Sequence, residues 1–407
     1  MTPAGSVVPA TPAPSTDPAA LYASIERQVE TIRGLAPKRL VTPVLLDEAG
    51  LRAELQAHSA EDNPPAATAR EQRLLKALGV LAPDADLAAV MNAFLSGQIA
   101  GFYRPKDGHL YVVSRSGAIG AAERTTFAHE YTHALQDQSF PLLQQLDGAG
   151  TAPRNGDRDL ARLAIIEGDA TLAMTVWAQD HLSPLELLDL LRSSFDPAQQ
   201  AALAAMPPFL RDTVLFPYQA GLQFAMGLQL SGGWPAVNAA FTAPPASTEQ
   251  VLHPDRYASH EAPVVVTLPT DLATRMGPGW TLDSEDTLGE LRIRAWLAAV
   301  GDSGVPVGSG ASPTPGSLAA ASSAADGWGG DRVATLRGPG GAWALVLRTT
   351  WDTDRDAQEF ANAVSAALAP GGRHGRLAAG ASPREEWLVL APSAELVLAA
   401  ERAATGR

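Results

Sequence analysis

Residues 129–133 read His-Glu-Tyr-Thr-His and lie inside a segment whose pattern predicts a helix. At 3.6 residues per turn, positions four residues apart differ by only about 40° around the helix axis. The side chains of His129 and His133 therefore project in nearly the same direction. Glu130 lies on the same broad face, about 100° from His129. Two imidazoles in this arrangement can hold one small cation, and the carboxylate can contact a water molecule beside it.

This spacing of two histidines and a glutamate is typical of zinc hydrolases. The alternative is a surface helix with solvated histidines. Residues 127–128 and 134–135 are apolar on both sides of the motif, so we expect the histidines to point into the protein. The motif predicts Zn²⁺ as a cofactor, with His129 and His133 as metal ligands and Glu130 as the general base.

Composition narrows the class of protein. The chain has 407 residues, of which 46% are hydrophobic and 18% are charged, as in a globular protein of two or three domains. A net charge of −14 argues against nucleic acid and anionic membrane surfaces as partners. The chain has no cysteine, so its own residues can form neither disulfides nor thiolate metal sites. Any zinc must be bound by histidine and carboxylate.

Targeting signals are not apparent in the sequence. No run reaches the roughly 18 apolar residues of a membrane span, and the Pro- and Ala-rich start shows no signal peptide. The compartment is open: an extracytoplasmic location fits if the start is truncated, and a cytoplasmic one otherwise.

Glu167 is the predicted third metal ligand. A catalytic zinc needs three protein ligands and one open position. Glu167 lies 34 residues after His133, among apolar residues of a helix predicted over residues 157–182. A carboxylate on the buried side of a helix is costly unless a cation or hydrogen bonds compensate it. The alternative is a Glu167 that pairs with Arg158 or Arg162.

Two stretches resemble gluzincins, the zinc metallopeptidases with two histidine ligands and one glutamate ligand. Residues 129–137, His-Glu-Tyr-Thr-His-Ala-Leu-Gln-Asp, resemble the gluzincin metal helix, and residues 167–170, Glu-Gly-Asp-Ala, resemble the stretch that carries the third ligand in the aminopeptidase branch. The motif match covers about residues 99–175. Gly-Phe-Tyr, Pro-Pro-x-Ser-Thr-Glu-Gln and Gly-Trp-Gly-Gly-Asp-Arg stretches are similar to those of uncharacterised bacterial metallopeptidase-like proteins. The resemblance implies zinc-dependent hydrolysis of peptide bonds in a peptide or protein substrate.

The predicted fold class is α+β. A mostly helical, zincin-like catalytic domain carries a small antiparallel sheet before the motif helix, and a small α+β domain follows. Strands near residues 98–103 and 109–113 form the predicted hairpin, which could offer an edge strand to an extended substrate or serve only as structure. The expected parts are a disordered tail (1–18), an N-terminal helical region (19–98), the gluzincin-like catalytic domain (99–300), a flexible linker (301–325) and the C-terminal α+β domain (326–407).

The chain departs from thermolysin-like gluzincins at two places. The spacing to Glu167 is longer, and the extra residues 139–157 are expected to form a loop or short helix over the site. Thermolysin-like enzymes carry an aspartate four residues after the glutamate, whereas this chain has Thr171. The role of orienting a metal histidine therefore falls to Asp137, Asp169 or a backbone carbonyl.

The resemblance also implies a donor for the oxyanion of the reaction, since a downstream histidine or tyrosine has this role in gluzincins. The candidates are His253, Tyr257 and Tyr218. We select His253 because it is expected at the end of a short helix that begins after Ser247, where an imidazole would be exposed. Each candidate could instead be an ordinary packed or solvated residue.

Two other interpretations of the motif are open. The chain could be a catalytically silent gluzincin-fold protein that acts as a binding or interaction module. It could also hold a structural zinc, although no fourth ligand is apparent. The sequence gives neither an oligomeric state nor a choice between endopeptidase and exopeptidase. It also leaves open whether the N-terminal helices inhibit the site.

Overall fold

The structure of the chain is a computed structural model. It describes residues 17–407 except for 52, 55–56, 58–63, 99, 114–118, 141–153, 194, 196, 302–312 and 370–373. Residues 1–16 of the predicted tail and most of the predicted loop at residues 139–157 therefore lie outside the described residues, whereas Pro18 begins a helix.

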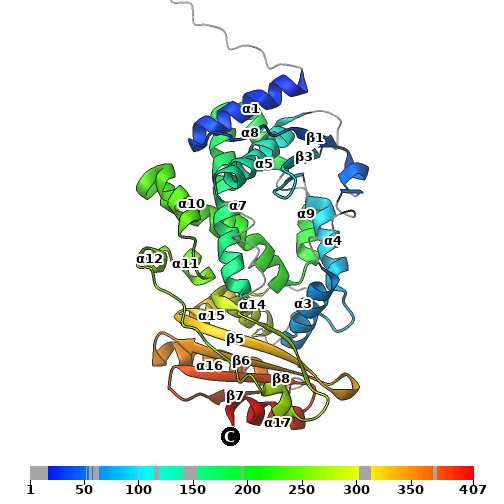
Figure 1. Cartoon of the computed structure of the whole chain (residues 1–407), viewed down its shortest axis with the longest axis vertical. Coiled ribbons are helices and arrows are strands. Elements are labelled where there is room, and N and C mark those ends of the chain that lie inside the picture. The colour runs from blue at the N-terminus through cyan, green and yellow to red at the C-terminus, as the bar shows by residue number, and fades with distance from the viewer. Residues whose placement is uncertain are drawn as a thin grey trace, which may run out of the picture.

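The protein is α+β and elongated, with helices around the motif at one end and a sheet at the other (Figure 1). The helices of the first end are α1 (Pro18–Arg33), α5 (Ala121–Ser139), α7 (Gly156–His181), α8 (Pro184–Ser193) and α10 (Pro208–Thr242). Further helices between the two ends are α3 (Pro65–Leu78), α4 (Leu87–Gln98), α9 (Pro197–Ala205), α11 (Thr248–Leu252) and α12 (Pro254–Ala258). Helix α7 runs along the long axis and connects both ends (Figure 1).

A small sheet precedes the motif helix. The predicted hairpin is confirmed as β2 (Gly101–Arg104) and β3 (His109–Val113), which are antiparallel. A strand that the sequence did not predict, β1 (Pro43–Leu46), pairs with β3 in parallel, so the sheet is mixed. The strand order β1-β3-β2 places β1 and β2 at the two edges, and α5 packs on β2 and β3.

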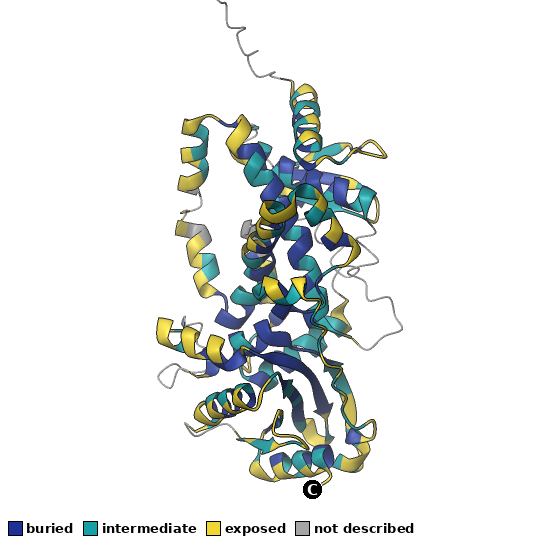
Figure 2. Cartoon of the chain, turned by 90° about the vertical axis from the view of Figure 1, so that its left-hand side faces the viewer, coloured by how far each residue is buried: buried dark blue, intermediate teal, exposed yellow. Residues whose placement is uncertain are grey.

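The second sheet is antiparallel and covered by helices on both faces. Its order is β4 (Thr281–Asp286), β5 (Trp328–Arg337), β6 (Trp343–Trp351), β8 (Glu385–Ala391) and β7 (His374–Ala379). One face packs on α14 (Gly289–Val300), α15 (Pro315–Ala325) and α16 (Asp354–Leu368), and the other on α13 (Leu272–Met276) and α17 (Ala394–Thr405). A short 3₁₀ turn, η1 (Pro339–Gly341), joins β5 to β6. The central strands are buried between helices that are exposed on their outer sides (Figure 2).

The predicted division of the C-terminal half differs from the structure in two respects. The expected linker over residues 301–325 contains helix α15, in which Ala321, Ala324 and Ala325 are buried; its residues 302–312 lie outside the described residues. Strand β4 joins the C-terminal sheet although it precedes the predicted boundary. Residues 264–268 form an extended segment with a backbone hydrogen bond to the sheet, from Val264 N–H to the carbonyl of Gly329.

Two glycines let α7 and α10 cross in close contact. A Cβ atom on Gly168 would lie 2.1 Å from the carbonyl oxygen of Gly221, and one on Gly221 would lie 2.2 Å from that of Ala164. Both distances are far below van der Waals contact, so the crossing needs glycine on both helices. This crossing lies directly after Glu167 in α7 and fixes which residues of α10 face it.

Helices α5 and α7 both have identifiable starts. Glu123 accepts a hydrogen bond from the backbone N–H of Gly120, which caps α5, and Asn155 caps α7 by accepting from Arg158 N–H. Among the described helices, none combines the length and apolar character needed to cross a membrane.

Candidate metal centre

The structure brings His129, His133 and Glu167 together. The Nε2 atoms of the two histidines lie 3.1 Å apart. Oε2 of Glu167 is 3.3 Å from His129 Nε2 and 3.4 Å from His133 Nε2. Glu167 thus faces the two histidines of α5 rather than Arg158, whose Nε lies 4.0 Å from Asp159. Three ligand atoms form a nearly equilateral triangle.

The size of this triangle fits a zinc ion. Zinc binds histidine nitrogen and carboxylate oxygen at about 2.0–2.1 Å with tetrahedral angles, which places neighbouring ligand atoms about 3.3 Å apart. The three observed separations of 3.1–3.4 Å match this value. Each side chain is 12–13% exposed, so the group is largely buried yet reachable. Three ligands leave the fourth position of a tetrahedron open.

Electrostatics within the group favour a positive charge. Burial raises the pKa of Glu167, but the charges and hydrogen bonds of His133 and His129 outweigh it and hold this pKa well below its usual range. Burial lowers the pKa of His133, and the charge of Glu167 outweighs burial and raises that pKa to about 9. The carboxylate therefore stays ionised and favours a positive charge beside it, which a protonated histidine or a bound metal ion can supply.

Glu130 lies beside the triangle but is not one of its members. Its side chain is buried, which raises its pKa, while the two histidines oppose this effect. The backbone N–H of Tyr103 in β2 donates a hydrogen bond to the carboxylate. Gly101 lets β2 lie this close to α5, because a Cβ at this position would lie 2.8 Å from the side chain of Thr126 in α5. The carboxylate of Glu130 is thus held against strand β2.

Tyr218 is the oxyanion-donor candidate that the structure places at this site. Burial raises the pKa of its hydroxyl, and the negative charges of Glu167 and Glu130 raise it further, with a hydrogen bond to Glu167. The residue is still 43% exposed, so its hydroxyl borders both the carboxylates and solvent. Tyr218 and Gly221 are three residues apart on α10, and the crossing at Gly221 directs Tyr218 toward Glu167.

His253, our first choice from sequence, is not brought to this group. The predicted short helix exists as α11, with Ser247 as its cap. However, His253 Nε2 lies 3.0 Å from Glu290 of α14, and this hydrogen bond raises its pKa. Tyr257 donates its hydroxyl to the carbonyl of Ala243 and packs on Phe224. The structure thus places His253 beside Glu290, because α11, which precedes it, packs on α7, α10 and α14.

The predicted orienting residues have different partners. Asp137 accepts hydrogen bonds from Tyr103 and Arg39 and contacts neither metal histidine. Asp169 contacts Gln136, which in turn lies 2.9 Å from Nδ1 of His133. Sequence reasoning missed Gln136, although it lies three residues after His133 and so on the same face of α5.

A second group of carboxylates already surrounds a cation of the chain. Glu249, Glu261 and Asp352 have oxygen atoms close enough to hold an ion. The guanidinium of Arg256 lies among them, in ion pairs with all three. This group is therefore a structural ion-pair network.

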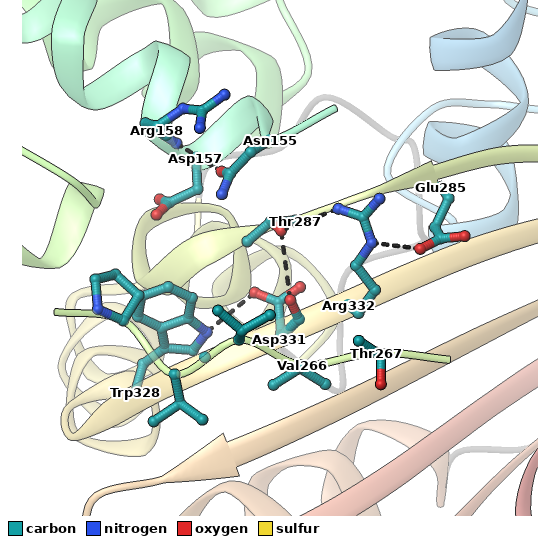
Figure 3. Close-up of a pocket in the computed structure, with 14 residues that line it drawn as sticks. Asn155, Asp157, Arg158, Val266, Thr267, Glu285, Thr287, Trp328, Asp331 and Arg332 are labelled. Atoms are coloured by element: carbon teal, nitrogen blue, oxygen red, sulfur yellow. Dashed lines mark hydrogen bonds and ion pairs between the residues drawn. The ribbon is translucent and has the colours of Figure 1, made fainter. Parts of the chain in front are cut away.

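The Gly-Trp-Gly-Gly-Asp-Arg and Pro-Pro-x-Ser-Thr-Glu-Gln stretches meet where α7 starts above β5, a region that we call the junction. Trp328 is buried and lies in β5. Asp331 accepts from the indole of Trp328 and from two backbone N–H groups at the start of α14. Asp157 of α7 accepts from Thr248. Figure 3 shows Asp157 above and Trp328, Asp331 and Arg332 below a cavity of about 340 Å³.

Comparison with known proteins bears on the sheet and not on the metal group. A family model described as a domain of unknown function (DUF8575) matches residues 279–395. The match begins just before β4 and ends at the start of α17, so it coincides with the five-stranded sheet. Neither a curated protein nor a solved structure matches the chain.

Proposed function

We propose that this chain is a zinc-dependent peptidase of the gluzincin type. The observation that carries the proposal is the triangle of His129, His133 and Glu167, whose sides equal the edges of a zinc tetrahedron. The acid Glu130 and the hydroxyl of Tyr218 lie beside this triangle. A structural zinc site would need a fourth protein ligand, and the described residues place three in this group.

In the proposed hydrolysis of an amide bond, Glu130 and Tyr218 would have separate roles beside the zinc. Zinc, when bound, would polarise the scissile carbonyl and make a water molecule more acidic. Glu130 would take a proton from that water as its oxygen bonds to the carbonyl carbon. Tyr218 would donate a hydrogen bond to the oxyanion that forms. Glu130 would then return the proton to the amine nitrogen as the C–N bond breaks.

The edge strand supports a peptide substrate. Strand β2 is one of the two edge strands of its sheet and holds Glu130 through the backbone N–H of Tyr103. An extended peptide that pairs with an exposed edge brings its carbonyl groups alongside the strand. A peptide bound along β2 would therefore pass Glu130 and the three ligands.

The test combines metal analysis with cleavage of a denatured generic protein. We expect one zinc per chain and cleavage by the wild type. Glu130→Gln should retain zinc and lose activity by roughly 100-fold or more, because general-base catalysis contributes about 10²–10⁴. Glu167→Ala should lose zinc, whereas Glu261→Gln, in the carboxylate group around Arg256, should retain it.

Two results would contradict the proposal in different ways. Cleavage that survives Glu130→Gln would refute the assigned mechanism. Zinc without cleavage in the wild type would instead favour the silent gluzincin-fold protein that acts as a binding module. Unchanged zinc in Glu167→Ala would show that the third ligand lies elsewhere.

A further inference from the structure

We infer that Gln136, Asp169 and Arg33 form a support that holds His133 in its metal-binding tautomer. Because Arg33 belongs to helix α1, this helix is then part of the metal centre. This inference rests on the proposed zinc site. All three residues are 0% exposed. They come from α5, α7 and α1, and they connect His133 to a residue 100 positions earlier in the chain.

The first link is the contact between His133 and Gln136. Nδ1 of His133 lies 2.9 Å from Oε1 of Gln136. A neutral imidazole has one N–H group and one lone pair, and its surroundings decide which nitrogen carries which. The orientation of the Gln136 amide therefore decides the tautomer of His133.

The second link fixes that amide. Its nitrogen, Nε2, lies 3.0 Å from the carbonyl oxygen of Ile166 and 2.8 Å from Oδ2 of Asp169. Both partners only accept hydrogen bonds, so the NH₂ group of Gln136 must face them. The amide oxygen then faces His133, which must donate from Nδ1. The lone pair remains on Nε2, the atom that lies 3.1 Å from His129 Nε2.

The third link is an ion pair between Asp169, which is completely buried, and Arg33. Nε of Arg33 lies 2.8 Å from Oδ1 of Asp169, and its Nη2 lies 3.1 Å from Oδ2. Arg33 also donates to Asn238 and lies 4.3 Å over the ring of Trp234. Without this guanidinium, the buried carboxylate would lack its counter-charge and would no longer be held where it accepts from Gln136. The Gln136 amide would then lose the partner that fixes its orientation.

Helix α1 is held firmly against α5. Tyr22 stacks on Phe127 with ring centres 4.3 Å apart, and Glu30 accepts a hydrogen bond from Tyr131. Phe127 and Tyr131 are neighbours of the metal histidines in the sequence. This packing places Arg33, in the last turn of α1, beside Asp169. Helix α1 thus acts as a component of the site and not as an inhibitory segment that is displaced from it.

Zinc affinity, measured by competition with a chromophoric chelator, tests the support. Gln136→Leu should weaken zinc binding roughly 10- to 100-fold, the usual loss when a residue that orients a metal ligand is changed. Gln138→Leu is the matched control. Gln138 is also buried on α5, but its oxygen accepts from the backbone N–H groups of residues 38 and 39. We expect its zinc affinity to stay within about twofold of the wild type, because it contacts neither histidine.

Arg33 is tested by rescue. Arg33→Met should weaken zinc binding, because it leaves Asp169 without its counter-charge. Adding Asp169→Asn should restore part of the affinity, because an uncharged amide still offers an oxygen to Gln136 and leaves no unpaired charge. A role of Arg33 in packing alone would give no such recovery.

NMR of the zinc-loaded wild type tests the tautomer without any variant. Nitrogen-15 spectra should show the His133 proton on Nδ1, with slow exchange. A proton on Nε2, or Gln136→Leu with wild-type zinc affinity, would overturn the support and leave the zinc site standing. A wild type that binds no zinc would overturn the proposed function and this inference together.

Discussion

At the scale of single residues, Tyr218 is the side chain on which the proposed chemistry is most open to test. We expect Tyr218→Phe to lower kcat roughly 100-fold or more with little change in KM, since removing one oxyanion donor costs about 10²–10³ in rate. Zinc content should not change, because the hydroxyl is not one of the three ligands. Steady-state kinetics and metal analysis measure both.

Tyr257→Phe is the matched control for this prediction. It removes the same hydroxyl group from a tyrosine that bonds to the carbonyl of Ala243 and not to the metal group. Wild-type kcat in Tyr257→Phe with a large loss in Tyr218→Phe is the expected pair of results. Equal rates in the wild type and in Tyr218→Phe would exclude Tyr218 as the donor.

At the scale of elements, the crossing of α7 and α10 decides the geometry of the site. Gly221→Ala should destabilise the protein by about 1–3 kcal/mol or more, because the added methyl group overlaps the backbone of Ala164. It should also weaken zinc binding, because α7 carries Glu167 next to the crossing. Chemical denaturation and zinc titration measure the two effects.

Gly227→Ala is the control on the same helix. A Cβ atom at Gly227 would meet nothing within 4 Å, so alanine should be neutral or raise the free energy of unfolding by up to about 1 kcal/mol. If Gly221→Ala were as harmless as Gly227→Ala, close backbone contact would not be what sets the crossing.

At the scale of the whole molecule, the junction joins the helices around His129 and His133 to the five-stranded sheet. Its buried carboxylates should make the stability of the protein depend on pH. Burial raises the pKa of Asp157 to about 8, and its hydrogen bonds to Thr248 oppose this effect only in part. Burial likewise raises the pKa of Asp331 to about 6. Between about pH 4 and these values, the unfolded chain loses protons that the folded chain keeps. The free energy of unfolding therefore falls as pH rises.

Asp157→Asn should remove the larger part of this dependence. Over pH 5–8 the free energy of unfolding should decline less steeply than in the wild type, by up to about 1.4 kcal/mol per pH unit for one proton. Asparagine still offers an oxygen to Thr248, so the junction keeps its contacts. Denaturation at several pH values measures the slope, and identical slopes in both proteins would show that Asp157 is not protonated in the fold.

Much of the local structure followed from sequence because its causes are local. The helix with both histidines, the hairpin before it and the helix with Glu167 occur close to where periodicity and turn residues predicted them. Strands β1 and β4 were missed because their partners lie far away in the chain. Strand β7 pairs with the nearby β8, and it and helix α15 were missed because short or alanine- and serine-rich sequence gives weak periodicity.

The sequence by itself determined the spacing that aligns His129 with His133, and it singled out Glu167 as a buried acid that needs a cation. Only the tertiary structure decided that Tyr218, and not His253, lies beside them. The same holds for Gln136 and Arg33, whose roles depend on contacts among three helices. The physical reason is that helix periodicity acts within one turn, whereas the crossing at Gly168 and Gly221 joins residues more than fifty positions apart.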